Sequence, residues 1–328
     1  MKAVQVSRFG DPRVLTLADV PEPVPGPGQV AVDVSHAAVG LVDVYIRQGL
    51  FKDRDGLPRP PYVPGLEVAG TVRALGDGVT GLAVGERVVA LAADGTGGYA
   101  PVYVADRARV FSTEGHPIDP ALAVAVLPNA LMAHVALTRA VHIAPGESVL
   151  VHGALGAFGA VFPGIARQLG VSRVVGTVRA GRLAAAAATR LPYDTVVDSA
   201  LLPEALAGEK FDVVVDPVGG AVRAQSLDLL APSGRLLLVG NASGDWSGTA
   251  GLDGNALWYG NLTVTGFNAG AYLPAHPDAV PPAAAAALAA AAAGLLDIEL
   301  DTFPLAEAAA AHERLENHTA SGRIVLTV

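Results

Sequence analysis

The chain has 328 residues, of which 22 are basic and 31 acidic, so its formal net charge is −9. This balance argues against a nucleic-acid partner, because phosphate backbones are bound by clustered positive charge. The sequence has no cysteine, which excludes disulfides, thiolate zinc sites and cysteine nucleophiles, and its length is sufficient for two domains.

The first residues, 1–6, are typical of a β-strand and lack the apolar block of a signal peptide. The longest apolar run, 283–296, is mostly alanine and is too short and too weakly hydrophobic to span a bilayer. We therefore expect a cytoplasmic protein with no membrane partner, which the absence of cysteine also fits.

The first third of the chain, to about residue 111, is rich in glycine, proline and alternating valines. Short strands are predicted over 30–34, 70–74, 87–91 and 100–104. Turn signals such as 25–28 and 76–78 separate them. This part of the chain therefore predicts a β-dominated domain.

From about residue 120 the pattern changes, beginning with a predicted helix over 121–137 that is interrupted near Pro128. The next predicted strands are 148–152, 173–178, 194–198, 211–216, 235–240 and 261–267, with helices over 182–190, 203–210 and 221–230. Helices over 281–296 and 305–317 and a last strand over 323–328 follow. Apolar strands alternating with helices are typical of a parallel sheet covered on both faces.

The stretch SVLVHGALGAFG, residues 148–159, is the most informative motif. An apolar run leads into a turn of small residues, after which a helical pattern continues to Leu169. Small residues let the backbone approach a pyrophosphate, which the helix N-terminus attracts. The residues predicted to bind it are Ala154, Gly156, Ala157, Phe158 and Gly159. Because Ala154 replaces the first glycine of the dinucleotide fingerprint, an ordinary strand–turn–helix is the alternative.

Pro163 lies inside the helix that this motif predicts. A proline there removes a hydrogen bond and costs about 3 kcal/mol unless the helix kinks or restarts. Its position therefore predicts an irregular helix and has no functional explanation.

The end of the second predicted strand indicates which cofactor is bound. It reads TVRAGR over 177–182, with two arginines and no carboxylate. An acidic residue here accepts the adenine-ribose 2′-hydroxyl, whereas arginine hydrogen-bonds a 2′-phosphate. Thr177, Arg179 and Arg182 are therefore predicted to bind the cofactor, and NADPH is favoured over NADH. Two solvated surface arginines are the alternative.

Two further strand ends are predicted to line the cofactor site. Ligands of open parallel sheets bind outside the carboxyl ends of the strands. Asp216 ends the fourth predicted strand of this half, and Gly240 and Asn241 follow the fifth. Asp216 is equally well suited to cap the helix that follows it.

Several short segments are common alone but specific in their order and spacing. They are VDVYIRQGL at 42–50, PGLEVAG at 64–70, GGYA at 97–100, PGESVLVHGA at 145–154, DPVGG at 216–220, AHERL at 311–315 and SGRIVL at 321–326. Together they cover nearly the whole length and resemble the medium-chain dehydrogenases/reductases, specifically the zinc-free quinone oxidoreductase branch.

The resemblance implies an α/β protein in which a Rossmann doubly wound parallel sheet is inserted into a GroES-like β-barrel domain. The substrate domain would comprise residues 1–121 and 270–328, and the NADPH-binding domain residues 122–269, with the active site in the cleft. Dimers of this family often pair the last strands of their Rossmann sheets. A homodimer through residues 261–267 is therefore expected.

Zinc-dependent members of the superfamily carry a Gly-His-Glu element and cysteine ligands. This chain has Gly65-Leu66-Glu67, no cysteine, and no tight ligand pair among its eight histidines. Metal-free chemistry is therefore predicted. A quinone, or an alkene conjugated to a carbonyl, accepts hydride into a delocalised anion that hydrogen-bond donors and a proton source can stabilise.

Tyr45 is the predicted donor of a hydrogen bond or proton to the substrate, with Arg47 assisting electrostatically. The alternatives are a tyrosine packed at the barrel surface and an Arg47 that simply pairs with Asp43. Asp43 is otherwise expected to organise its loop. His152 follows an apolar strand, so we expect a packed structural histidine rather than a catalytic base.

The resemblance also implies further residues near the cofactor. They are Val239, Gly240, Asn241, Phe267, Asn268 and Arg323. For Arg323, which is expected near the cofactor phosphates, a charge at the start of an edge strand is the alternative.

Two departures from the family pattern leave the substrate open. Gly40 stands where quinone reductases usually have asparagine, and Met132 where they usually have threonine. Both changes predict a roomier, more apolar pocket, although core repacking explains Met132 equally well. We expect an NADPH-dependent quinone reductase. The alternatives are an enone or enoyl reductase, and an NADPH-binding sensor or partner module with little catalysis.

Overall fold

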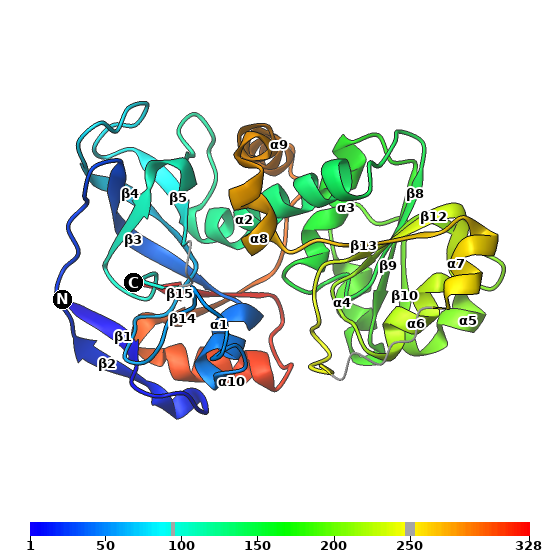
Figure 1. The fold of residues 1–328 in the computed structure, drawn as a ribbon, viewed down its shortest axis with the longest axis horizontal. Coiled ribbons are helices and arrows are strands. Elements are labelled where there is room, and N and C mark those ends of the chain that lie inside the picture. The colour runs from blue at the N-terminus through cyan, green and yellow to red at the C-terminus, as the bar shows by residue number, and fades with distance from the viewer. Residues whose placement is uncertain (93–95, 247–252) are drawn as a thin grey trace. The chain divides into compact units, whose positions relative to one another are not determined.

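A computed structural model describes residues 1–328 except 93–95 and 247–252 (Figure 1). The chain forms two compact units, one of Met1–Pro128 with Glu299–Val328 and the other of Asn129–Ile298. The first unit is dominated by antiparallel strands, and the second holds a parallel sheet. The predicted α/β class, with a parallel sheet inserted into a β-domain, is confirmed.

In the first unit, the described residues form a seven-stranded sheet with the order β14-β15-β3-β4-β5-β7, in which β6 pairs with β3, and a separate β1–β2 pair. The strands are β1 (Lys2–Val6), β2 (Leu15–Asp19), β3 (Gln29–Val39), β4 (Glu67–Leu75), β5 (Arg87–Leu91), β6 (Val102–Asp106), β7 (Val110–Ser112), β14 (Leu300–Pro304) and β15 (Arg323–Thr327). Helices α1 (Leu41–Gln48) and α10 (Ala308–Glu316) pack beside them. Alternating valines such as Val30, Val32 and Val34 fill the core.

In the second unit, the described residues form a six-stranded parallel sheet with the order β10-β9-β8-β11-β12-β13. The strands are β8 (Ser148–Val151), β9 (Arg173–Val178), β10 (Thr195–Asp198), β11 (Phe211–Asp216), β12 (Leu230–Leu238) and β13 (Thr263–Gly266). The helices are α3 (Phe162–Gln168), α4 (Leu183–Ala188), α5 (Leu202–Ala205), α6 (Ala221–Leu227), α7 (Gly254–Gly260), α8 (Ala269–Ala275) and α9 (Val280–Ala292). This order is that of the doubly wound dinucleotide-binding fold, whose strand order reverses beside β8.

The helix predicted over 121–137 is not interrupted at Pro128, which corrects the prediction. Helix α2 (Pro120–Val135) continues through the proline. Residues on both sides of Pro128 are buried, so tertiary packing outweighs the one lost hydrogen bond. Residues Pro120–Ala140 are long and apolar enough to span a bilayer, but 78% of an 18-residue window within them is buried inside the protein, as expected for a core helix.

Pro163 is accommodated because the helix restarts. The chain forms a short 3-10 turn at Gly159–Val161, and α3 then begins at Phe162. Pro163 therefore lies in the first turn of α3, where a missing N–H leaves no intrahelical bond unmade.

The compact units divide the chain at Ile298 rather than at the predicted boundary of residue 270, so that α8 and α9 fall in the second unit. Helix α9 buries Ala283, Ala287 and Ala290 and packs against α3. The chain after α9 approaches α3 so closely that a Cβ on Gly164 would lie 2.5 Å from the carbonyl oxygen of Leu295. The alanines of α9 and the glycine at position 164 of α3 therefore let α9 and the chain after it pack closely against a helix of the second unit.

Candidate functional site

The glycine-rich turn lies at the carboxyl end of β8, where the strand order of the sheet reverses. The Ala154 N–H donates to the carbonyl of Thr177 at 2.9 Å, and the Gly156 N–H donates to the carbonyl of Gly153 at 2.8 Å. A side chain on Gly159 would collide with the Gly153 carbonyl. Because Gly159 has no side chain, the chain can make this tight turn and present its backbone at the place where doubly wound sheets bind dinucleotides.

Asn129 supports this turn and was not predicted from the sequence. Its side chain is 5% exposed, and its amide donates to the carbonyl of Ala157 at 3.0 Å. Phe158 packs its ring against Phe162, with centroids 5.1 Å apart. Two neighbouring residues in the middle of the turn, Ala157 and Phe158, are therefore held by a hydrogen bond and by ring packing. The signal in the sequence is a single asparagine within an otherwise apolar helical segment, because such a side chain needs a hydrogen-bond partner when it is buried.

His152 and Thr177 form a buried polar pair beneath the turn. Nδ1 of His152 lies 3.0 Å from Oγ1 of Thr177, and Nε2 lies 3.0 Å from Oγ of Ser226. Burial lowers the pKa of His152 to about 4, so the ring is neutral. The predicted structural histidine is confirmed. Thr177 is 1% exposed and bonded to His152, and its contact with a cofactor remains a prediction.

Arg179 and Arg182 follow β9, the strand next to β8, so both lie at the same sheet edge as the turn. Arg179 is exposed and Arg182 is half-buried. Two guanidinium groups at this place provide donors for a phosphate dianion, and no carboxylate occurs between residues 177 and 182 to repel it. Their contact with a cofactor remains a prediction.

Asp216 caps the turn after β11. The residue is fully buried, and its Oδ1 accepts bonds from the N–H groups of Val218 and Gly219 at 2.8 and 2.7 Å. Its Oδ2 accepts a bond from Nε of Arg223 at 2.8 Å. The expected alternative, a capping role, is therefore observed, and the contact of Asp216 with the cofactor remains a prediction. Arg223 also donates to the Gly240 carbonyl at 2.9 Å, so the network joins two loops of the same edge.

The loops after β12 and β13 extend this edge. The Val239 N–H donates to the carbonyl of Asp216 at 3.0 Å, and Asn241 donates to the carbonyl of Asp245 at 2.7 Å. Asn268 caps α8 by accepting a bond from the Gly270 N–H at 3.0 Å. Phe267 is 6% exposed and packs against Tyr272. The sheet thus brings the predicted second-unit residues to one edge, where their cofactor contacts stay predictions.

In the first unit, Tyr45 lies on α1 and is half-buried. Its ring meets the edge of Phe51, with centroids 6.1 Å apart. Burial raises the pKa of the Tyr45 hydroxyl above 10, so this group keeps its proton at neutral pH. A neutral hydroxyl on a partly exposed side chain is a suitable hydrogen-bond donor.

Arg47 points into the interior of the first unit. Its side chain has no exposed surface and forms an ion pair with Glu316 on α10. Its partner is therefore not Asp43, and its predicted electrostatic assistance to the reaction remains a prediction. The pair instead fastens α1, which carries Tyr45, to α10.

Asp43, Glu67 and Arg323 form a second charged cluster beside the start of α1. Oδ2 of Asp43 accepts a bond from the Gly40 N–H at 2.8 Å, which confirms that Asp43 organises this loop. Arg323 is 7% exposed and is ion-paired with Glu67. The expected contact of Arg323 with cofactor phosphates remains a prediction.

The Asp43 cluster predicts a pH-dependent stability that Asp43→Asn should remove. Burial and the neighbouring Glu67 raise the pKa of Asp43 from 3.8 to about 7. Between these values the native protein holds a proton that the unfolded chain releases, so the free energy of unfolding falls as pH rises. The full difference is about 4 kcal/mol above pH 7. About 2.5 kcal/mol of this difference falls between pH 5 and pH 8, and urea denaturation at these two pH values measures it. An equal decline in both proteins would contradict the assignment.

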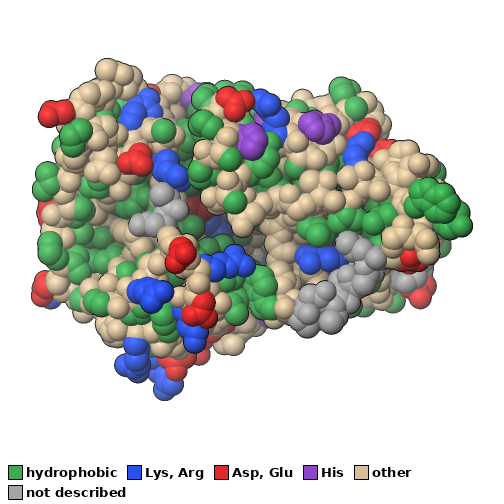
Figure 2. Space-filling view, viewed as in Figure 1, with side chains coloured by type: hydrophobic (Ala, Val, Ile, Leu, Met, Phe, Trp, Pro, Cys, Tyr) green, Lys and Arg blue, Asp and Glu red, His purple; other side chains and the backbone are tan. Residues whose placement is uncertain are grey.

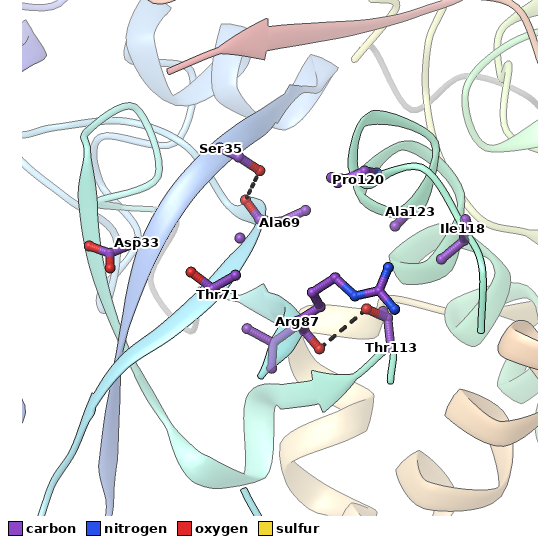
Figure 3. Close-up of a pocket in the computed structure, with 11 residues that line it drawn as sticks. Asp33, Ser35, Ala69, Thr71, Arg87, Thr113, Ile118, Pro120 and Ala123 are labelled. Atoms are coloured by element: carbon purple, nitrogen blue, oxygen red, sulfur yellow. Dashed lines mark hydrogen bonds between the residues drawn. The ribbon is translucent and has the colours of Figure 1, made fainter. Parts of the chain in front are cut away.

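A cavity of about 210 Å³ lies in the first unit, apart from the predicted site residues (Figure 3). It is lined by β3, β4 and β5 together with the chain leading into α2. Its charged side chains are paired, Asp33 with Arg73 and Arg87 with Glu114. The hydroxyls of Ser35 and Thr113 donate to the carbonyls of Ala69 and Arg87. With these charged and hydroxyl groups bonded to other parts of the protein, this cavity gives no indication of a ligand.

The residues present do not fit a zinc site. Among the described residues, no group of three histidine, aspartate or glutamate side chains could hold a metal ion. Glu67, which follows Gly65 and Leu66, is bonded to the guanidinium of Arg323. A carboxylate already paired with a buried cation is a poor ligand for a second cation.

Comparison with known proteins gives a consistent relationship. Residues 26–114 match the alcohol dehydrogenase GroES-like domain, and residues 169–326 match a family described as zinc-binding dehydrogenase. A quinone oxidoreductase of Pseudomonas aeruginosa is 33% identical, covering 99% of each chain. A 2-haloacrylate reductase of Burkholderia sp is 29% identical over 99% of this chain and 98% of its own. The Escherichia coli quinone oxidoreductase complexed with NADPH is 26% identical and superposes with a TM-score of 0.85 over 100% of both chains.

Proposed function

Because the chain belongs to the zinc-free quinone oxidoreductase branch of the medium-chain dehydrogenases/reductases, we propose that it reduces a quinone with a hydride from NADPH. It is an NADPH-dependent oxidoreductase. The proposal is supported mainly by the glycine-rich turn at the carboxyl end of β8, where the strand order reverses, and by Arg179 at the same edge of the sheet. A cytoplasmic location is part of the proposal, and cell fractionation tests it.

The cofactor supplies the hydride, and the protein provides binding, orientation and hydrogen bonds. Those backbone N–H groups of the turn 154–159 that are not bonded within the protein bind the diphosphate. Arg179 and Arg182 bind the 2′-phosphate. Tyr45 donates its hydroxyl proton, or a hydrogen bond, to the oxygen on which negative charge develops.

Reduction of a conjugated carbon–carbon double bond is the second candidate. The full-length similarity to a 2-haloacrylate reductase favours it. Gly40 caps α1 and Met132 is half-buried on α2, so neither offers a polar side chain to a substrate. Both reactions place negative charge on a conjugated oxygen, which Tyr45 would stabilise in the same way.

A panel of acceptors separates the two candidates. Purified protein is given NADPH with naphthoquinones, benzoquinones, unsaturated ketones, enoyl thioesters and 2-haloacrylate, with and without a chelator. Rapid, chelator-insensitive oxidation of NADPH by quinones alone supports the first candidate. A saturated carbonyl product supports the second. Absence of turnover with every acceptor would contradict both.

Arg179→Ala should weaken NADPH binding far more than NADH binding. The variant loses one charge-assisted bond to the 2′-phosphate, a group that NADH lacks. This should cost about 1.5–3 kcal/mol, which is roughly tenfold to a hundredfold in Kd. Fluorescence titration with both nucleotides measures it, with Arg190→Ala as a matched surface control. Equal weakening of both nucleotides would remove the basis for the assignment.

A homodimer is also part of the proposal. Strand β13 ends the parallel sheet and so offers its open edge to a second copy. Figure 2 shows hydrophobic side chains gathered over α7, where Trp258 and Tyr259 are 71% and 77% exposed. Analytical ultracentrifugation should find a dimer that Trp258→Ser weakens. A wild-type monomer at micromolar concentration would contradict this part.

A further inference from the structure

Three residues from separate segments, Ala154 in the glycine-rich turn, Gly176 and Tyr193, lie in contact with one another. Ala154 is fully buried and occupies the position of the first fingerprint glycine. A Cβ on Gly176 of β9 would lie 2.6 Å from the Ala154 methyl carbon and 3.1 Å from Cε1 of Tyr193. The Ala154 methyl group therefore occupies space that exists because residue 176 has no side chain.

Tyr193 joins the two ends of this turn. Its hydroxyl lies 3.1 Å from the carbonyl oxygen of Ala154 and 3.0 Å from that of Gly159, and its single proton is shared between these two acceptors. Burial raises the pKa of the Tyr193 hydroxyl well above 10, so the proton is always present. One hydroxyl thus spans the whole segment that is predicted to bind the diphosphate.

The position of Tyr193 is itself fixed by its neighbour. Oδ2 of Asp194 accepts a bond from the Val174 N–H at 2.6 Å and pairs with Arg167 at 2.6 Å. The ring of Tyr193 packs against Ala154 and Val178. The residue next to Tyr193 is therefore bonded to both strand β9 and helix α3, and this fixes the chain that carries the hydroxyl.

We propose that Tyr193 is a positioning residue for NADPH. By fastening the carbonyls of Ala154 and Gly159, it holds the turn so that its free N–H groups converge on the diphosphate. Gly176 leaves space for the methyl group of Ala154, and Tyr193 bonds the carbonyls of the turn. Together the three residues allow alanine at the position where the usual fingerprint has its first glycine. This inference rests on the proposed binding of NADPH at the turn.

Tyr193→Phe tests the proposal because it removes only the hydroxyl. The Kd and the KM for NADPH should rise about fivefold to tenfold, whereas kcat at saturating NADPH stays within about twofold. Tyr99→Phe is the matched control, because it removes a buried hydroxyl in the first unit that bonds His312 at 3.0 Å. Both variants are measured at a temperature where circular dichroism shows them folded.

Unchanged NADPH affinity in Tyr193→Phe would overturn the proposal, and so would an equal loss in Tyr99→Phe. If wild-type protein binds no NADPH, the proposed function fails first, so the two failures are distinguishable. A second arm uses Gly176→Ala, which should weaken NADPH binding through its collision with Ala154. Adding Ala154→Gly should restore most of that affinity. No restoration would contradict the joint role of these residues.

Discussion

Glu316→Gln will lower the free energy of unfolding of the first unit by about 3 kcal/mol, because it leaves the buried guanidinium of Arg47 without its charge partner. The Arg47 side chain has no exposed surface, whereas that of Glu316 is 24% exposed. Breaking a buried ion pair usually costs about 3–5 kcal/mol of unfolding free energy, and because Glu316 is partly exposed we expect the lower value. Urea denaturation followed by circular dichroism measures the loss.

The double variant Arg47→Met/Glu316→Gln is the control for this prediction. Replacing both charges removes the unpaired cation, so most of the lost stability should return. If the single variant is as stable as wild type, the ion pair does not hold α1 against α10. A double variant less stable than the single one would also contradict the account.

Tyr45→Phe should lower kcat for quinone reduction by about 100-fold, the lower end for removing a proton donor or oxyanion donor. The substitution removes one oxygen from a half-buried ring and leaves the ring contact with Phe51 in place. The Kd for NADPH and the stability should change little. Single-turnover oxidation of bound NADPH measures the step directly.

The control for Tyr45 is a second tyrosine hydroxyl removed elsewhere. Tyr259→Phe alters a side chain that is 77% exposed on α7 of the second unit, and it should leave kcat unchanged. If Tyr45→Phe retains wild-type kcat, the hydroxyl takes no part in the reaction. The proton would then come from solvent or from another group.

The arrangement of the second unit could be predicted because the patterns that indicate it lie in short stretches of sequence. Alternating apolar strands and helices admit few parallel topologies, and a turn of small residues identifies the edge that binds a ligand. The roles of His152 and Asp43 were also predictable. An isolated histidine after a buried strand is usually packed, and an acidic residue in the first turn of a helix usually caps it.

Contacts between residues far apart in the chain could not be predicted. Arg47 and Glu316 are separated by most of the sequence, and no local pattern pairs them. The carboxylate of Asp216 pairs with Arg223, and nothing in the sequence shows this pairing. The unit to which helix α9 belongs could not be predicted, because a run of alanines does not reveal which surface it covers.

The central claim is that this chain oxidises NADPH with a conjugated acceptor and without a metal ion. The most direct measurement is the rate of NADPH and NADH oxidation by a naphthoquinone, using protein dialysed against a chelator and assayed for bound metals. We predict turnover that favours NADPH at least tenfold in kcat/KM and needs no metal. Loss of activity on dialysis with recovery on adding zinc, or failure to bind either nucleotide, would contradict the account.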